Sequence, residues 1–73
     1  MLHLIAYRDQ TGKDFNGLPW IKIASDDLDY AKYQASKMET EYNLKDVVLA
    51  ECEDEELPET VTWDFIYGHK SVY

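Results

Sequence analysis

The residues of this chain that could do chemistry are above all its carboxylates. Six fall within nine positions that hold no Lys or Arg: Glu51, Glu53, Asp54, Glu55, Glu56 and Glu59. Three more, Asp26, Asp27 and Asp29, stand together earlier in the chain, and Asp64 follows later. Grouped carboxylates can transfer protons, ligate cations or present a negative surface to a basic partner. The sequence must therefore be tested against each of these uses.

Catalysis by carboxylates requires that at least one of them lie in a pocket that shifts its pKa. A domain of 73 residues buries only about 60% of the surface that its unfolded chain exposes, which leaves little room for such a pocket. Nucleophilic catalysis needs a serine together with a histidine and an acid, and no serine here belongs to such a pattern. We expect no catalytic residues, and a small enzyme is the least favoured function.

The loop that begins at Asp9 is the nearest approach to a metal-binding motif. An EF-hand loop starting there would need an oxygen ligand at position 5, glycine at position 6 and glutamate at position 12. The sequence places Lys13, Asp14 and Trp20 at those positions, so the match fails. The glycine-rich patterns of nucleotide-binding loops are also missing from the sequence. We therefore expect a plain hairpin loop, no bound metal and no cofactor.

Cys52 is the only cysteine, so no disulfide can form within the chain, which favours an intracellular protein. Carboxylates flank it on both sides and raise the pKa of a thiol, so we expect a buried structural cysteine rather than a reactive one. His3 and His69 stand too far apart in sequence for the clustered spacing of a zinc site. We expect His3 to be a packed, hydrogen-bonded residue of a strand.

Composition limits the class of protein further. The 73 residues carry a net charge of −8 but are 14% aromatic, which is typical of a single folded domain over residues 1–73. No apolar run approaches the length of about 18 residues that a membrane span needs. The excess of carboxylates argues against direct binding to the phosphates of nucleic acids.

The elements that must position the carboxylates follow from hydrophobic periodicity. Residues 2–8 and 18–24 alternate as strands, and Gly12, Asn16 and Gly17 in the loop between them suit positive φ. Large apolar side chains on both faces of residues 2–8 indicate a central strand. A helix is predicted after Ser25 as its N-cap, with an apolar stripe of Leu28, Ala31, Ala35, Met38 and Tyr42, and Asn43 at its end.

The second half of the chain predicts two further strands. Residues 46–52 hold a β-branched run, and residues 60–67 alternate with Val61, Trp63, Phe65 and Tyr67 on one face. We expect that aromatic face beneath the helix, and a tail that frays from about residue 69. The predicted fold is α+β: a four-stranded antiparallel sheet with one helix on one face, in the order strand-strand-helix-strand-strand. The other sheet face would then expose some of His3, Ile5, Tyr7, Thr62, Asp64 and Ile66.

These features predict a binding protein that occludes a basic surface of a protein partner, such as a nucleic-acid-binding site. Alternate residues of a strand lie about 6.6 Å apart on one face, so carboxylates on a strand could imitate a phosphate chain. Small acidic inhibitors of bacteriophages, including anti-restriction and anti-CRISPR proteins, have this size and charge, and on that basis we expect an anti-defence protein of the host cytoplasm. Tyr30 and Tyr33, off the apolar stripe, are candidate contacts. The alternative is a homodimeric structural or regulatory module assembled through its sheet.

Overall fold

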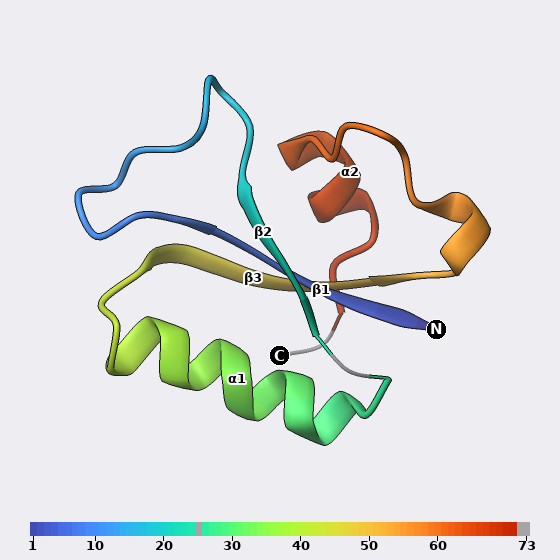
Figure 1. The fold of residues 1–73 in the computed structure, drawn as a ribbon, viewed down its shortest axis with the longest axis horizontal. Helices are drawn as coiled ribbons and strands as arrows, with labels where there is room; N and C mark the ends of the chain where they lie inside the picture. Colours follow the sequence, from blue (N-terminus) through green and yellow to red (C-terminus); the bar gives the residue numbers. More distant parts are fainter. Residues whose placement is uncertain (25, 72–73) are drawn as a thin grey trace.

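A computed structural model of the chain describes residues 1–24 and 26–71. In chain order its elements are β1 (Leu2–Arg8), β2 (Trp20–Ala24), α1 (Leu28–Thr40), β3 (Lys45–Cys52), the 3-10 turn η1 (Asp54–Glu56) and α2 (Trp63–Gly68). The three strands form one antiparallel sheet in the order β2-β1-β3 (Figure 1). The α+β fold, the central place of residues 2–8 and the hairpin that joins the first two strands are confirmed.

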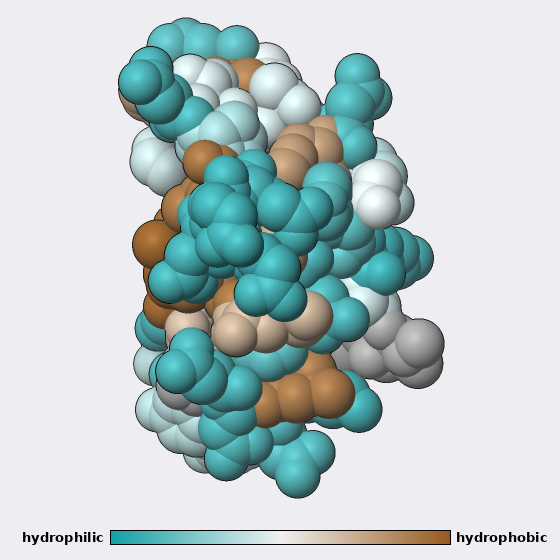
Figure 2. All heavy atoms as spheres, turned by 90° about the vertical axis from the view of Figure 1, so that its right-hand side faces the viewer, coloured by the Kyte–Doolittle hydropathy of each residue, from teal (hydrophilic) through white to brown (hydrophobic). Residues whose placement is uncertain are grey.

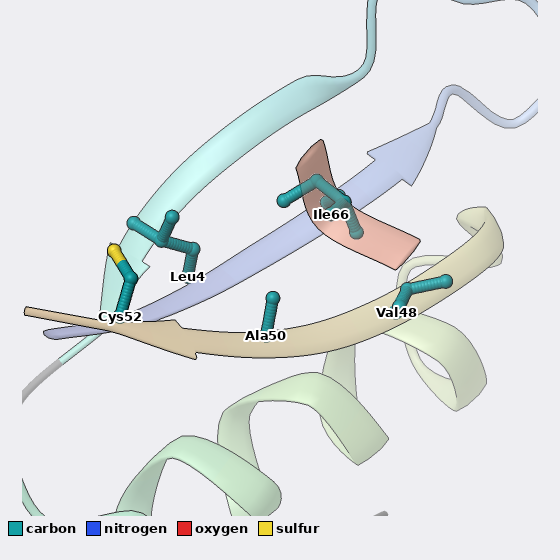
Figure 3. Packing of buried hydrophobic residues seen from close by; sticks show 6 residues of the cluster. Leu4, Val48, Ala50, Cys52 and Ile66 are labelled. Atoms are coloured by element: carbon teal, nitrogen blue, oxygen red, sulfur yellow. The ribbon is translucent and has the colours of Figure 1, made fainter. Parts of the chain in front are cut away.

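The central strand β1 is buried on both of its faces. Leu4, Ile5 and Ala6 are all 0% exposed, although neighbouring side chains of a strand point to opposite sides of the sheet. Helix α1 covers the face of Ile5 with the buried side chains of Ala31, Ala35 and Met38. The segment that contains α2 covers the other face, where Figure 3 shows Leu4, Val48, Ala50, Cys52 and Ile66 on the side of the sheet away from α1.

The prediction of a fourth strand over residues 60–67 is wrong. Residues 63–68 form the short helix α2, whose N-cap is Thr62: its side-chain oxygen accepts a hydrogen bond from the backbone N–H of Phe65 at 3.1 Å. An oxygen at this position satisfies an amide that the first helical turn leaves without a partner. Trp63 and Phe65 consequently pack on the sheet face opposite α1, not beneath it.

The exposed sheet face that the four-stranded arrangement would create is also wrong. Ile5 and Ile66 are both 0% exposed, and Tyr7 is half-buried against the cluster beneath α1. The place that a fourth strand would take beside β3 belongs to residues 69–71, in the tail that the sequence predicts to fray. The N–H of Glu51 donates to the carbonyl of His69 at 3.0 Å, and the N–H of Ser71 donates to the carbonyl of Leu49 at 2.9 Å.

Helix α1 begins later than the sequence predicts. Asp27 is its N-cap and accepts hydrogen bonds from the backbone N–H groups of Asp29 and Tyr30, at 2.9 and 3.4 Å. Ser25, the predicted N-cap, lies outside the described residues. The far end agrees with the prediction, because Asn43 adopts a positive φ of 55° just beyond the helix. Of the apolar stripe, the three central members are buried, whereas Leu28 and Tyr42 are exposed.

Removing the side chain of Ile66 tests the role of α2 as a cover for the sheet. We expect Ile66→Ala to lower the free energy of unfolding by about 3 kcal/mol, because the residue is 0% exposed and its loss leaves a cavity. The matched control is Ile23→Ala, the same change at a position that is 59% exposed, which should cost less than about 1 kcal/mol. Urea denaturation measures both, and equal costs would contradict the two-sided core.

Candidate functional site

The antiparallel register brings two acidic segments to one end of the sheet. Ala24, the last residue of β2, pairs with His3, and Cys52, the last residue of β3, pairs with Leu2. The segments that follow these two strands therefore leave the sheet beside the start of β1, as Figure 1 shows at its right-hand side. We call this group of carboxylates the acidic end; its members are Asp26, Asp27, Asp29, Glu51, Glu53, Asp54, Glu55 and Glu56.

Residues 53–56 of the acidic end form a turn and not a row of charges along a strand. Asp54–Glu56 form the 3-10 turn η1, and the side chain of Glu56 closes it by accepting a hydrogen bond from the backbone N–H of Glu53 at 2.9 Å. A 3-10 turn distributes successive side chains around its axis, about three to a turn. The expectation that these carboxylates are spaced along a strand is therefore wrong for residues 53–56, and only Glu51 lies in β3.

The carboxylates of residues 51–56 have little compensating positive charge. Two imidazoles lie within 4 Å of them in the described chain: His3 Nδ1 is 3.8 Å from Glu51 and His69 Nε2 is 3.6 Å from Glu56. No ion pair between these carboxylates and a Lys or Arg occurs within residues 1–24 and 26–71. Figure 2 views this end of the molecule and shows hydrophilic side chains across its middle, with a hydrophobic band at the left margin.

His3, beside the acidic end, was predicted to be packed and hydrogen-bonded, and only the first part of that prediction is confirmed. The side chain is packed as expected, at 4% exposure, but its Nδ1 atom makes no hydrogen bond within the described part of the chain. The nearby Glu51 carboxylate is the only ionic group paired with it there, at a distance longer than a hydrogen bond.

Four of the predicted site residues do not join the acidic end. Asp64 lies in the first turn of α2, after Trp63. The ring of Trp63 stacks on Arg8 at the opposite end of β1, with 4.4 Å between the guanidinium carbon and the ring centroid. Glu59 borders a shallow hollow that Phe15 and Trp20 also line. Tyr30 and Tyr33 face a different groove, between β2 and α1.

That groove contains positive charge, and the sequence predictions missed it. We call it the lysine–tyrosine groove; it has a volume of about 220 Å³ and is lined by Lys22, Tyr30, Tyr33, Gln34, Lys37, Met38 and Tyr42. None of its lining residues is acidic. The sequence signal was a second stripe on the predicted helix, at residues 30, 33, 34 and 37, which has the spacing of one helical face. Its meaning depends on Lys22 lying opposite, which only the fold reveals.

Asp9 has a structural role in the loop between β1 and β2. Asp9 Oδ1 accepts hydrogen bonds from the backbone N–H groups of Thr11 and Lys13 and from the Thr11 hydroxyl, at 2.9, 2.9 and 2.6 Å. These bonds, with that from the hydroxyl as the largest contribution, lower the pKa of Asp9. The predicted hairpin loop is confirmed, with positive φ at Gly12 and at Asn16–Gly17. Within residues 1–24 and 26–71, no group of three or more His, Cys, Asp or Glu side chains is arranged to hold a metal ion.

Comparisons with protein-family models, with curated proteins and with solved structures find no match to this chain. Over the described residues, neither helix is long and apolar enough to cross a membrane.

Cys52 gives a test of the packing beside the acidic end. Its side chain is 2% exposed, and burial raises the pKa of the thiol, with further increases from Glu56, Asp54 and Glu53. The folded thiol should stay protonated at pH 8.5, where an unfolded cysteine is about half ionised. We expect alkylation by iodoacetamide to be at least about 100-fold slower in the folded protein than in urea.

The sign of the corresponding pH effect on stability follows from the raised pKa. The stability that the protonated thiol contributes is fully present below the unfolded pKa of about 8.5 and declines as the pH rises through the folded pKa.

In the alkylation experiment, Cys52→Ser should abolish the signal and serves as the blank. Equal labelling rates for folded and unfolded protein would show that the thiol is accessible.

Proposed function

We propose that this protein is a non-enzymatic inhibitor whose acidic end occludes a basic, nucleic-acid-binding surface of a protein partner. The observation that carries the proposal is the placement of two acidic segments at one end of the sheet, where residues 51–56 form no ion pair with a Lys or Arg among the described residues. Negative charge that is not neutralised internally produces a field that attracts a basic surface and accelerates association.

The shape of the acidic end favours a protein groove as the target rather than a flat surface. The η1 turn projects from the end of β3, and residues 53–56 are all exposed. A projecting acidic turn can enter a groove that normally holds the phosphates of a nucleic acid. Such a partner loses access to its nucleic acid by simple occlusion, and no chemical step is needed.

A protein of this kind fits an anti-defence role against a host nuclease or restriction system, in the cytoplasm of a phage-infected cell. The role requires a small, rapidly associating, acidic inhibitor, which is what the size and charge of this chain supply. The alternative of a homodimer assembled through its sheet would have to use an edge strand, because Ile5 and Ile66, two of the side chains expected on an open sheet face, are 0% exposed.

The acidic end is tested with a pair of charge-matched variants. Asp54→Asn combined with Glu55→Gln removes two exposed carboxylates from η1, while Glu39→Gln combined with Glu41→Gln removes two from the last turn of α1 and just beyond it. Both variants change the net charge equally, and neither alters the hydrogen bond between Glu56 and Glu53. Immobilised protein captures partners from host lysate, and competition with DNA is then measured on the captured protein.

We expect the wild type and the α1 variant to displace DNA from the captured partner equally well. The η1 variant should bind about tenfold more weakly at low salt and show a shallower dependence of affinity on salt concentration, because exposed charges are screened over about 8–10 Å. Circular dichroism confirms that both variants are folded. Equal losses for the two variants would mean that net charge alone matters, and an unchanged affinity for the η1 variant would exclude the acidic end as the contact.

A further inference from the structure

The two edges of the sheet differ in whether another segment of the chain covers them. The outer edge of β3 is covered by residues 69–71, which form a bridge between Ala50 and Lys70 and two backbone hydrogen bonds. The outer edge of β2 has no such partner in residues 1–24 and 26–71. A strand at an open edge presents alternate backbone N–H and C=O groups that can pair with another chain.

Helix α1 packs mainly over β1 and β3 and contacts β2 less. Its buried residues Ala31, Ala35 and Met38 pack in one cluster with Ile5 of β1, Leu49 of β3 and Ala24, the last residue of β2. Its second stripe lies over the lysine–tyrosine groove, where Tyr30 and Tyr33 remain 48% and 60% exposed. The groove therefore adjoins the edge strand β2 at Lys22, on the α1 side of the sheet.

The two faces of β2 differ in chemistry at this edge. Lys22 pairs with Ile5, so its side chain points to the α1 side and into the groove, where Lys37 also lies. Ile23 pairs with Leu4, so it points to the opposite side, where it is 59% exposed. Lys37 is held by Glu41 at 3.9 Å and lies 5.9 Å from the ring of Tyr33, whereas Lys22 has no ion pair with any described residue.

We propose that the edge of β2 binds an extended segment of a partner protein whose alternate residues are carboxylates and apolar side chains. The segment adds to the sheet as a fourth strand. Its acidic side chains point into the groove towards Lys22 and Lys37, and its apolar side chains lie beside Ile23 on the other face. Backbone pairing supplies affinity and the two faces supply specificity, as in other complexes formed by strand addition.

Charge decides between this occupant and a second copy of the chain. Antiparallel pairing of two β2 strands about their middle residue would place Lys22 opposite Lys22 of the other copy, and like charges directly opposite destabilise a strand pair. An edge lysine commonly protects a sheet from self-association. The same side chain attracts an acidic strand, so Lys22 disfavours a homodimer and favours the proposed partner.

The probe for this site is the capped peptide Ac-Ser-Val-Glu-Val-Glu-Val-Ser-NH2, titrated into the full-length ¹⁵N-labelled protein and followed by amide chemical shifts. We expect saturable shifts at residues 20–24 and at Tyr30 and Tyr33, with a dissociation constant below about 1 mM. The peptide with both glutamates replaced by lysine should bind at least about tenfold more weakly. Two peptides N-methylated at alternate amides should differ, because only one set of amides pairs with β2.

The matched protein variants are Lys22→Ala with Lys37→Ala, against Lys32→Ala with Lys45→Ala outside the groove. The first should weaken binding at least about tenfold and the second less than about twofold. Equal binding of the lysine peptide, shifts centred on the acidic end, indifference to N-methylation, or no shifts up to about 10 mM peptide would each overturn the proposal. So would sedimentation that shows a dimer formed through β2. The test is independent of the acidic end, because neither variant alters residues 51–56.

Discussion

The burial of β1 on both faces is the constraint on which the rest of this structure depends. Leu4, Ile5 and Ala6 are adjacent and all 0% exposed, so no single layer can cover them. The described residues form one long helix, α1, and that helix covers only the face of the sheet on which Ile5 lies. The opposite face must be covered by whatever remains, which is the segment after β3. Burial of Ile66 against Leu4 therefore outweighs the strand pattern of residues 60–67.

The same constraint shapes the charge distribution. Because residues 57–68 are needed over the sheet, the chain must turn sharply after Cys52, and the 3-10 turn at Asp54–Glu56 makes that turn. Polar side chains suit a turn that makes no core contacts, and none of the residues of η1 is buried. The antiparallel register then places this turn at the same end of the sheet as the start of α1. The acidic end is thus produced jointly by topology and by sequence, and neither alone predicts it.

The sequence predicted the elements whose local signals agree with their tertiary surroundings. Residues 2–8 alternate between two apolar sets and form a strand covered on both sides, and Ala31, Ala35 and Met38 recur at helical spacing and are buried. Residues 60–67 carry conflicting signals, because their alternation favours a strand whereas Thr62 can cap a helix. Packing against residues distant in the sequence decides whether such a segment forms a helix or a strand, and the segment's own sequence does not contain that information. The lysine–tyrosine groove escaped prediction for the same reason, since Lys22 and Lys37 meet only across the fold.

The acidic end and the lysine–tyrosine groove carry opposite charges on one small protein, so each can influence the binding of a partner to the other. The two surfaces adjoin at the start of α1, where Asp29 of the acidic end precedes Tyr30 of the groove, and screening at physiological ionic strength acts over about 8 Å. The carboxylates at the start of α1 therefore reduce the positive potential that Lys22 and Lys37 create beside β2, whereas the η1 turn is a separate contact surface. A partner that presents a basic groove and an acidic strand could engage both surfaces of one molecule. In that case the second contact forms at the high effective concentration that the first contact creates, and the overall affinity exceeds that of either surface alone.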